Sequence, residues 1–186
     1  DRFTLLFLGR FGRFVKPDMW LDVLARLRAR GVAADALQFV ITGHFPEEAR
    51  VRARELGIAD QIRPHPHVPY QEIGAAMAAA DLLVAMVQPG VTQRIASKLY
   101  DYLASERPVL VVADNPEVER LLRDSGAGVM LGYHDAQAVA DHIAGQLDLG
   151  RQRRVPRRPA GATSREATGR LAAILDAVCR QRTPGG

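Results

Sequence analysis

Long apolar runs and cysteine are scarce in this sequence of 186 residues. No apolar stretch reaches the roughly 20 residues that a membrane-spanning helix needs, so we expect no transmembrane helix. The one cysteine, Cys179, has no partner for an internal disulfide, which makes a reducing cytoplasm the simplest compartment. The chain opens at Asp1 without a methionine and enters strand-like residues by Phe3, so we expect a fragment that starts at a domain boundary of a longer protein.

Lysine is scarce as well. Only Lys16 and Lys98 are lysines among the 25 basic residues, and the formal net charge is +4. Both lysines fall in glycine- or serine-containing loops beside predicted strand ends, where a compact cation can meet an anion. Residues 151–158 (RQRRVPRR) carry five arginines, and we expect residues 151–163 to form an exposed linker. Nucleic acid or an acidic membrane surface could use this run, but no aromatic residues interleave it, which favours a solvated connector and no nucleic-acid partner.

Hydrophobic residues make up 47% of the chain, enough to bury the core of one domain. Apolar runs alternate with amphipathic stretches, which is typical of an α/β fold. The predicted strands are residues 3–8, 37–42, 61–63, 81–87, 108–113 and 129–131. We therefore predict a doubly wound, Rossmann-like parallel sheet of about six strands in residues 1–150, with a helix at 164–182 that packs back on this domain. Asp18 is the predicted N-cap of the first helix, and Trp20 a core residue.

The stretch from Val87 to Asp114 (VQPGVTQRIASKLYDYLASERPVLVVAD) organises the rest of the chain. A loop and a short helix join two predicted strands, which gives a βαβ unit. A helix that starts at the carboxyl end of a parallel strand offers free N–H groups and its positive dipole end to a phosphate. Asp101 follows Ser97 by one helical turn and can reach a ribose hydroxyl from the same side. The pattern predicts a nucleotide-binding site; the alternative is an ordinary surface ion pair between Lys98 and Asp101.

Two further segments carry polar groups at predicted strand ends. The loop at residues 9–17 (GRFGRFVKP) contains three cations: Arg10, Arg13 and Lys16. In PHPHVP, His65 and His67 stand two residues apart, but no cysteine, third histidine or carboxylate lies at ligand spacing, so we expect no metal site. Two interpretations of this histidine segment stay open: a loop whose backbone edges contact a nucleobase, or a plain surface turn.

Four motifs together carry a family resemblance. They are FLGR at residues 7–10 with Lys16, VITGHFPEE at 40–48, HVPYQEIGAAMAAADLLVAMV at 67–87 and KLYDYLASERPVLVVAD at 98–114. In order and spacing they resemble the C-terminal, donor-binding domain of GT-B fold glycosyltransferases of the retaining group 1 (family 4) type. The likeness covers nearly the whole chain, and the last motif resembles the family's Lys-Leu-Tyr-Glu-Tyr-Leu-Ala form.

The resemblance implies roles for particular residues. The implied contacts of the donor diphosphate are Gly9, Arg10, Lys16, Ser97 and Lys98, and Arg10 and Lys16 would also support the transition state. The implied ribose contact is Asp101, the donor-sugar contacts are Thr92 and Gln93, and the nucleobase contacts are His65 and Gly43. The sequence departs from the family at three points. Gln93 stands where the family usually has Glu, Glu106 replaces an expected glycine, and the spacing from Arg10 to Lys16 is one residue longer than usual.

The resemblance also implies an activity and partners. The expected reaction is metal-independent, retaining transfer of a sugar from a UDP- or GDP-linked donor to a glycan, lipid or other acceptor, with no cofactor. The acceptor pocket and the usual catalytic histidine belong to an N-terminal domain that this chain lacks, so we expect the chain alone to be inactive. The expected location is the cytoplasm, with the inner face of the membrane as the site of any peripheral association of the full-length protein. Two alternatives stay open: a sugar-nucleotide epimerase of the same fold, and a non-catalytic nucleotide-sugar-binding or interaction domain, which Gln93 favours.

Overall fold

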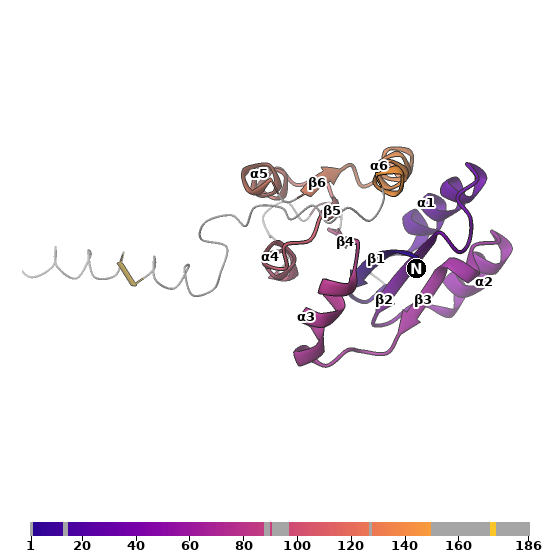
Figure 1. Ribbon diagram of the computed structural model, residues 1–186, viewed down its shortest axis with the longest axis horizontal. Coiled ribbons are helices and arrows are strands. Elements are labelled where there is room, and N and C mark those ends of the chain that lie inside the picture. The colour runs from indigo at the N-terminus through magenta and orange to yellow at the C-terminus, as the bar shows by residue number, and fades with distance from the viewer. Residues whose placement is uncertain are drawn as a thin grey trace, which may run out of the picture.

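The computed structural model describes residues 2–12, 15–87, 90, 97–126, 128–149 and 172–173. Its centre is a six-stranded sheet with strand order β3-β2-β1-β4-β5-β6, in which every neighbouring pair is parallel (Figure 1). The strands are β1 (Phe3–Leu8), β2 (Leu37–Thr42), β3 (Ile62–His65), β4 (Leu82–Met86), β5 (Val109–Val112) and β6 (Gly128–Leu131). The helices are α1 (Asp18–Ala29), α2 (Glu47–Glu55), α3 (Tyr70–Ala79), α4 (Ser97–Ala104), α5 (Pro116–Ser125) and α6 (Ala136–Asp148), with a short 3-10 helix at Ala59–Gln61. The predicted doubly wound α/β fold is confirmed.

Helices cover both faces of the sheet, and the central strands β4 and β5 are apolar along their whole length for this reason. Successive side chains of a strand point to opposite faces, so β1 contributes to two separate apolar layers. Leu5 and Phe7 pack in a layer with residues of α1, α2 and α6, whereas Leu6 and Leu8 pack in a layer with residues of α3, α4 and α5. The first layer holds most of the aromatic rings; there Trp20 is fully buried with its ring centroid 5.2 Å from that of Phe39, as predicted.

Two local predictions need correction. Asp18 is not the N-cap of α1: the helix begins at Asp18, Pro17 occupies the cap position, and no side chain caps it. A carboxylate in the first turn still interacts favourably with the positive end of the helix dipole. The third strand was predicted to end at Arg63, but it continues through Pro64 to His65. Proline is tolerated there because β3 is the edge strand of the sheet.

The start of α5 is capped by a side chain. The Asn115 side chain accepts hydrogen bonds from the N–H groups of Glu117 and Val118, and Pro116 occupies the first helical position. The predicted linker at 151–163 lies outside the described residues, as do Cys179 and the predicted helix at 164–182 apart from residues 172–173. Among the helices of the described part, none has the length and apolar character needed to cross a membrane.

Candidate functional site

The chain changes direction across the sheet at β1. From β1 the chain adds β2 and β3 on one side, then crosses to add β4, β5 and β6 on the other. In open α/β sheets, ligands bind outside the carboxyl ends of the strands at such a switch point. Here β1 stays paired with β2 through Leu8, opposite Thr42, whereas its pairing with β4 ends one residue earlier, at Phe7 opposite Val84. The carboxyl ends of the two central strands therefore separate at the switch point.

Two glycines line the β2 side of this point. The N–H of Gly9 donates to the carbonyl of Thr42, and the N–H of Gly43 donates to the carbonyl of His65, each over 3.1 Å. Gly43 has a φ of 132°, and a Cβ added there would lie only 2.3 Å from the carbonyl oxygen of Gly9. The close approach of the two backbones thus requires glycine at position 43, and it leaves main-chain groups rather than side chains at this edge.

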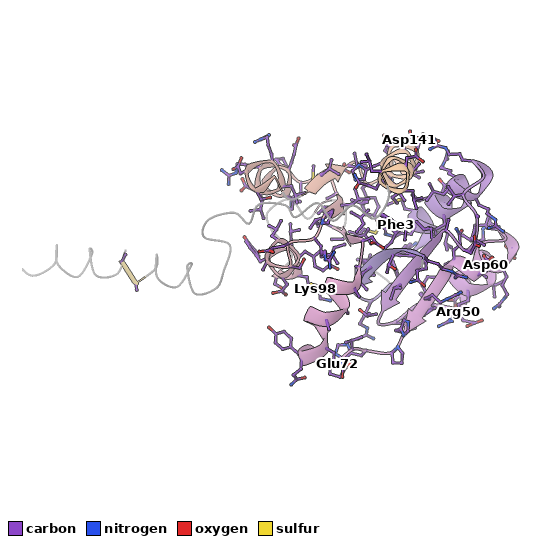
Figure 2. All side chains as sticks on the ribbon, viewed as in Figure 1. Phe3, Arg50, Asp60, Glu72, Lys98 and Asp141 are labelled. Atoms are coloured by element: carbon purple, nitrogen blue, oxygen red, sulfur yellow. The ribbon has the colours of Figure 1, made fainter. Side chains whose placement is uncertain are left out.

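Helix α4 lies on the β4 side and is attached to the end of β1 by two side chains. The Tyr102 hydroxyl accepts a hydrogen bond from the Leu8 N–H over 3.0 Å and donates one to the Val84 carbonyl over 3.3 Å. Burial raises the pKa of Tyr102, so the hydroxyl stays protonated and able to donate. Lys98, labelled in Figure 2, donates from Nζ to the Leu8 carbonyl over 2.9 Å.

Sequence reasoning missed the contact of Tyr102. Tyrosine at helical spacing is usually a core residue, and the ring of Tyr102 is indeed buried to 1% exposure. The available signal was its i, i+4 relation to Lys98, because this spacing places both side chains on one face of a helix. That face meets the ends of β1 and β4, as the hydrogen bonds to Leu8 and Val84 show.

Asp101 lies on a different face of α4. It is exposed and lines a cavity of about 500 Å³ between α3 and α4, together with Tyr70 and Gly74 of α3. Among the described residues, no salt bridge joins Asp101 to Lys98, whose ammonium group contacts the Leu8 carbonyl instead. The surface ion pair that the sequence left open is therefore not observed. Ser97 is the exposed first residue of α4.

The two cations predicted to share a diphosphate are both exposed in the segment that follows β1. Arg10 lies beside Gly43, since the Arg10 Cγ is 3.4 Å from where a Cβ of Gly43 would stand.

Lys16 faces the loop between β6 and α6, where it lines a cavity of about 410 Å³. The polar side chains that share this cavity with Lys16 are Asp18, Asp22, Tyr133 and His134. Burial, followed by the charge of Asp18, raises the pKa of Tyr133. Tyr133 and His134 were not predicted, because only the tertiary fold brings residues more than a hundred positions away to Lys16.

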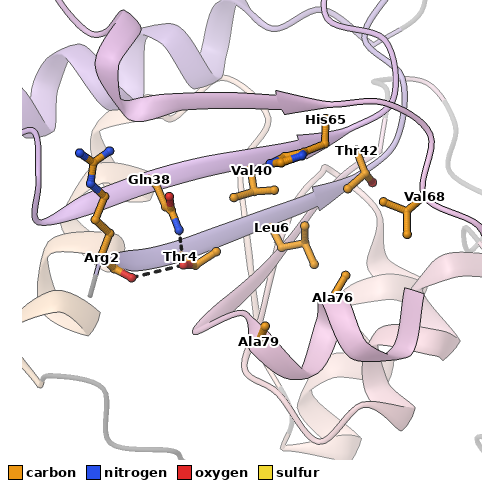
Figure 3. A pocket seen from close by; sticks show the side chains of 10 residues that line it. All are labelled: Arg2, Thr4, Leu6, Gln38, Val40, Thr42, His65, Val68, Ala76 and Ala79. Carbon is orange, nitrogen blue, oxygen red and sulfur yellow. Dashed lines mark hydrogen bonds between the residues drawn. The ribbon is translucent and has the colours of Figure 1, made fainter. Parts of the chain in front are cut away.

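His65 ends β3 at the carboxyl edge of the sheet, with an exposed side chain. It lines a cavity of about 440 Å³ between the sheet and α3, with Thr42 and Val68 at the same end (Figure 3). At the other end of this cavity, Gln38 donates to the Thr4 hydroxyl over 2.9 Å, and one of the two dashed lines in Figure 3 marks this bond. The structure thus places His65 and Gly43, the two predicted nucleobase contacts, at adjacent strand ends.

Some predicted residues are not placed. Thr92 and Gln93, the predicted sugar contacts, and Arg13 lie outside the described residues. Within the described part of the chain, no three histidine, cysteine or carboxylate side chains gather closely enough to hold a metal ion.

Comparison with protein families gives one match over most of the chain. The family described as glycosyl transferases group 1 matches residues 2–148. Among curated proteins, the D-inositol 3-phosphate glycosyltransferase of Geodermatophilus obscurus is 29% identical over 180 residues, which is 90% of this chain and 38% of that protein. D-inositol 3-phosphate glycosyltransferase 1 of Catenulispora acidiphila is 28% identical over 158 residues, which is 80% of this chain and 36% of that protein. The chain thus spans well under half the length of these relatives.

Solved structures share the fold at low sequence identity. HepE of Anabaena in complex with UDP-glucose superposes with a TM-score of 0.72 at 16% identity, over 95% of this chain and 49% of HepE. WaaG, a glycosyltransferase involved in lipopolysaccharide biosynthesis, superposes with a TM-score of 0.61 at 21% identity, over 79% of this chain and 38% of WaaG. These similarities confirm the predicted Rossmann-like fold, which matches part of each of these larger structures.

Proposed function

The chain belongs to the group 1 glycosyl transferases, and we propose that it is the domain of a longer glycosyltransferase that binds a nucleoside diphosphate sugar. The observation that carries this proposal is the separation of β1 and β4 at the switch point, beside the N-terminus of α4. Main-chain groups of two glycines lie on the β2 side of that point and Lys98 of α4 on the β4 side, with Asp101 on another face of the same helix. Glycine backbone, a helix N-terminus and cations are the groups that bind phosphates in α/β proteins.

Each part of the donor then has a proposed partner. Arg10, Lys16 and Lys98 neutralise the diphosphate beside the Gly9 backbone, together with the main-chain N–H groups at Ser97 and Lys98. Asp101 accepts hydrogen bonds from the ribose hydroxyls in the cavity between α3 and α4. The nucleobase lies against the strand ends at Gly43 and His65. Thr92 and Gln93 remain the proposed contacts of the transferred sugar.

The chemistry proposed for this site is stabilisation of a leaving group. As the bond between the sugar and the diphosphate breaks, negative charge grows on the diphosphate and the anomeric carbon becomes oxocarbenium-like. Arg10, Lys16 and the positive end of α4 stabilise that growing charge without a metal ion. The transfer is retaining, and the acceptor pocket and catalytic histidine come from an N-terminal domain of the full-length protein. The present chain alone then binds the donor but does not turn it over.

Calorimetric titration of the chain with UDP, GDP and ADP at two salt concentrations tests the proposal. UDP and GDP are the expected donor nucleotides, and UDP is the nucleotide bound in the HepE complexes. We expect saturable binding of one diphosphate at both salt concentrations, lost in Lys16→Ala. An absence of binding to all three nucleotides contradicts the proposed site. Binding that falls steeply with salt and is equal for all three would instead indicate a non-specific anion site on an arginine-rich surface.

A further inference from the structure

Tyr102 makes a contact that packing alone does not require. Its ring belongs to the apolar layer between the sheet and α3, α4 and α5, where a phenylalanine would fit equally well. Its hydroxyl, however, lies between two strands, accepting from the Leu8 N–H of β1 and donating to the Val84 carbonyl of β4. A buried hydroxyl with both a donor and an acceptor partner is a specific arrangement, because burying it unpaired would be costly.

The position of this hydroxyl coincides with the separation of the two strands. The pairing of β1 with β4 ends at Phe7 and Val84, and the next main-chain donor and acceptor are the Leu8 N–H and the Val84 carbonyl. Both are bonded to Tyr102. The phenol thus stands between the two strands where they part, and it satisfies groups that would otherwise pair with each other or with water.

Lys98 and Tyr102 together fix the last residue of β1. Tyr102 accepts from the Leu8 N–H and Lys98 donates to the Leu8 carbonyl, so two side chains one turn apart on α4 hold both sides of Leu8. Gly9 follows directly, with its own N–H bonded to Thr42 of β2. The start of the loop that carries Arg10 is therefore positioned between β2 and α4, and α4 is the helix that carries Asp101.

We propose that Tyr102 is a positioning residue of the donor site. Its hydroxyl holds the carboxyl ends of β1 and β4 apart and sets the distance between the Gly9 loop, which would bind the diphosphate, and Asp101, which would bind the ribose. This inference rests on the proposed function, because it assigns the two sides of the switch point to two parts of one nucleotide. Tyr102 does not touch the nucleotide; it acts through Leu8 and the position of α4.

The test compares Tyr102→Phe with two control variants by calorimetric titration with UDP and UMP. Tyr102→Phe keeps the ring in the apolar layer and removes only the hydroxyl. Tyr100→Phe is the matched control, because this tyrosine lies on the same helix but is 38% exposed. Ile143→Val, in the layer on the opposite face of the sheet, controls for a general loss of stability, which urea unfolding measures in all three variants.

We expect the Kd for UDP to rise about three- to tenfold in Tyr102→Phe, the loss that follows from misplacing one or two hydrogen bonds. The Kd for UMP should rise less, because UMP lacks the β-phosphate that spans from the ribose side toward the Gly9 loop. Both control variants should stay within about twofold of the wild type, which is less than the loss of one hydrogen bond.

Two results would overturn the inference while leaving the proposed function standing. One is wild-type affinity for UDP in Tyr102→Phe. The other is an equal loss in Ile143→Val at the same loss of stability, which would make the effect of Tyr102 merely structural. A wild-type chain that binds no UDP, GDP or ADP would overturn the proposed function and this inference together.

Discussion

The two ends of the β1–β4 pair are built in opposite ways. At the amino end, the Asp81 N–H donates to the Thr4 carbonyl over 3.0 Å, and the Asp81 carboxylate accepts from the Thr4 N–H over 2.8 Å. These reciprocal bonds hold the two strands together. At the carboxyl end the pairing stops, and the Tyr102 hydroxyl bonds to one strand on each side.

We infer that the two ends of this strand pair have different roles: the amino end stabilises the fold, and the carboxyl end forms the proposed binding site. Asp81 closes the amino end and serves the fold, since a carboxylate bonded to a main-chain N–H stabilises the folded state. Tyr102 and Lys98 satisfy the main chain at the carboxyl end, where the two strands no longer pair, and this end is the candidate site. Mutations at the two ends should therefore affect different measurements: unfolding free energy at the amino end, and nucleotide affinity at the carboxyl end.

The largest effect on affinity is expected from the cations of the carboxyl end. Arg10→Ala or Lys16→Ala should each weaken UDP binding by about 1.5–3 kcal/mol, the usual contribution of hydrogen bonds to charged groups. Both side chains are exposed, so the unfolding free energy should change little. Calorimetric titration measures the first quantity and urea unfolding the second, with the exposed Arg28→Ala as the control. Unchanged affinity in both variants would remove this loop from the site.

At the amino end, a mutation should lower the unfolding free energy and leave UDP affinity unchanged. Asp81→Ala leaves the Thr4 N–H without its carboxylate acceptor and should lower the unfolding free energy by about 1–3 kcal/mol. UDP affinity should stay unchanged, because the carboxyl ends of β1 and β4 are held by Tyr102. Urea unfolding measures the unfolding free energy and calorimetry the UDP affinity of the same preparation, with the exposed Asp35→Ala as the matched control. A large loss of UDP affinity in Asp81→Ala would erase the distinction between the two ends.

A smaller and more selective effect is expected at Asp101. Asp101→Asn should weaken UDP binding by about 1 kcal/mol, because an amide accepts a hydrogen bond less strongly than a carboxylate. Pyrophosphate, which has no ribose, should bind as it does to the wild type. Competition titrations with UDP and pyrophosphate measure how much the affinity for each ligand changes. Equal losses for UDP and pyrophosphate would argue against a ribose contact.

The smallest effect is expected in the turn after α4. Glu106 has a φ of 57°, and among the described residues it is the one non-glycine with a positive φ. A side chain in this left-handed region costs about 1 kcal/mol, so Glu106→Gly should raise the unfolding free energy by about 0.5–1 kcal/mol. Urea unfolding measures this change in unfolding free energy, and UDP affinity should stay unchanged. A destabilised Glu106→Gly would show that the glutamate side chain compensates for the strain.

The sequence predicted much of this architecture because the signals were local. Apolar runs marked five of the six strands, whereas β3 was predicted at residues 61–63 (QIR), which are not an apolar run. Glu106 was recognised as standing where a glycine is expected, and its positive φ gives the physical reason. The end of β3 was missed, because prolines usually end strands and only the edge position of β3 makes Pro64 acceptable.

The candidate site was predictable to a lesser extent. Gly9, Gly43, His65 and Lys98 come together at the carboxyl edge because each follows or faces a strand end, which the sequence shows. The bridging role of Tyr102 was not predictable, because it depends on where β1 and β4 separate, and pairing register is a property of the folded sheet. The proximity of Lys16 to Tyr133 and His134 likewise arises from packing between distant segments.

The most direct test of the central claim is amide chemical-shift mapping of the ¹⁵N-labelled chain during titration with UDP. UDP binding at the switch point should shift the amides of Gly9, Gly43, Ser97 and Asp101, around the carboxyl end of the β1–β4 pair. The amides of Thr4 and Asp81, at the amino end of the same two strands, should not shift. Shifts confined to the amino end, or spread over arginine-rich surfaces away from the switch point, would contradict binding at the switch point.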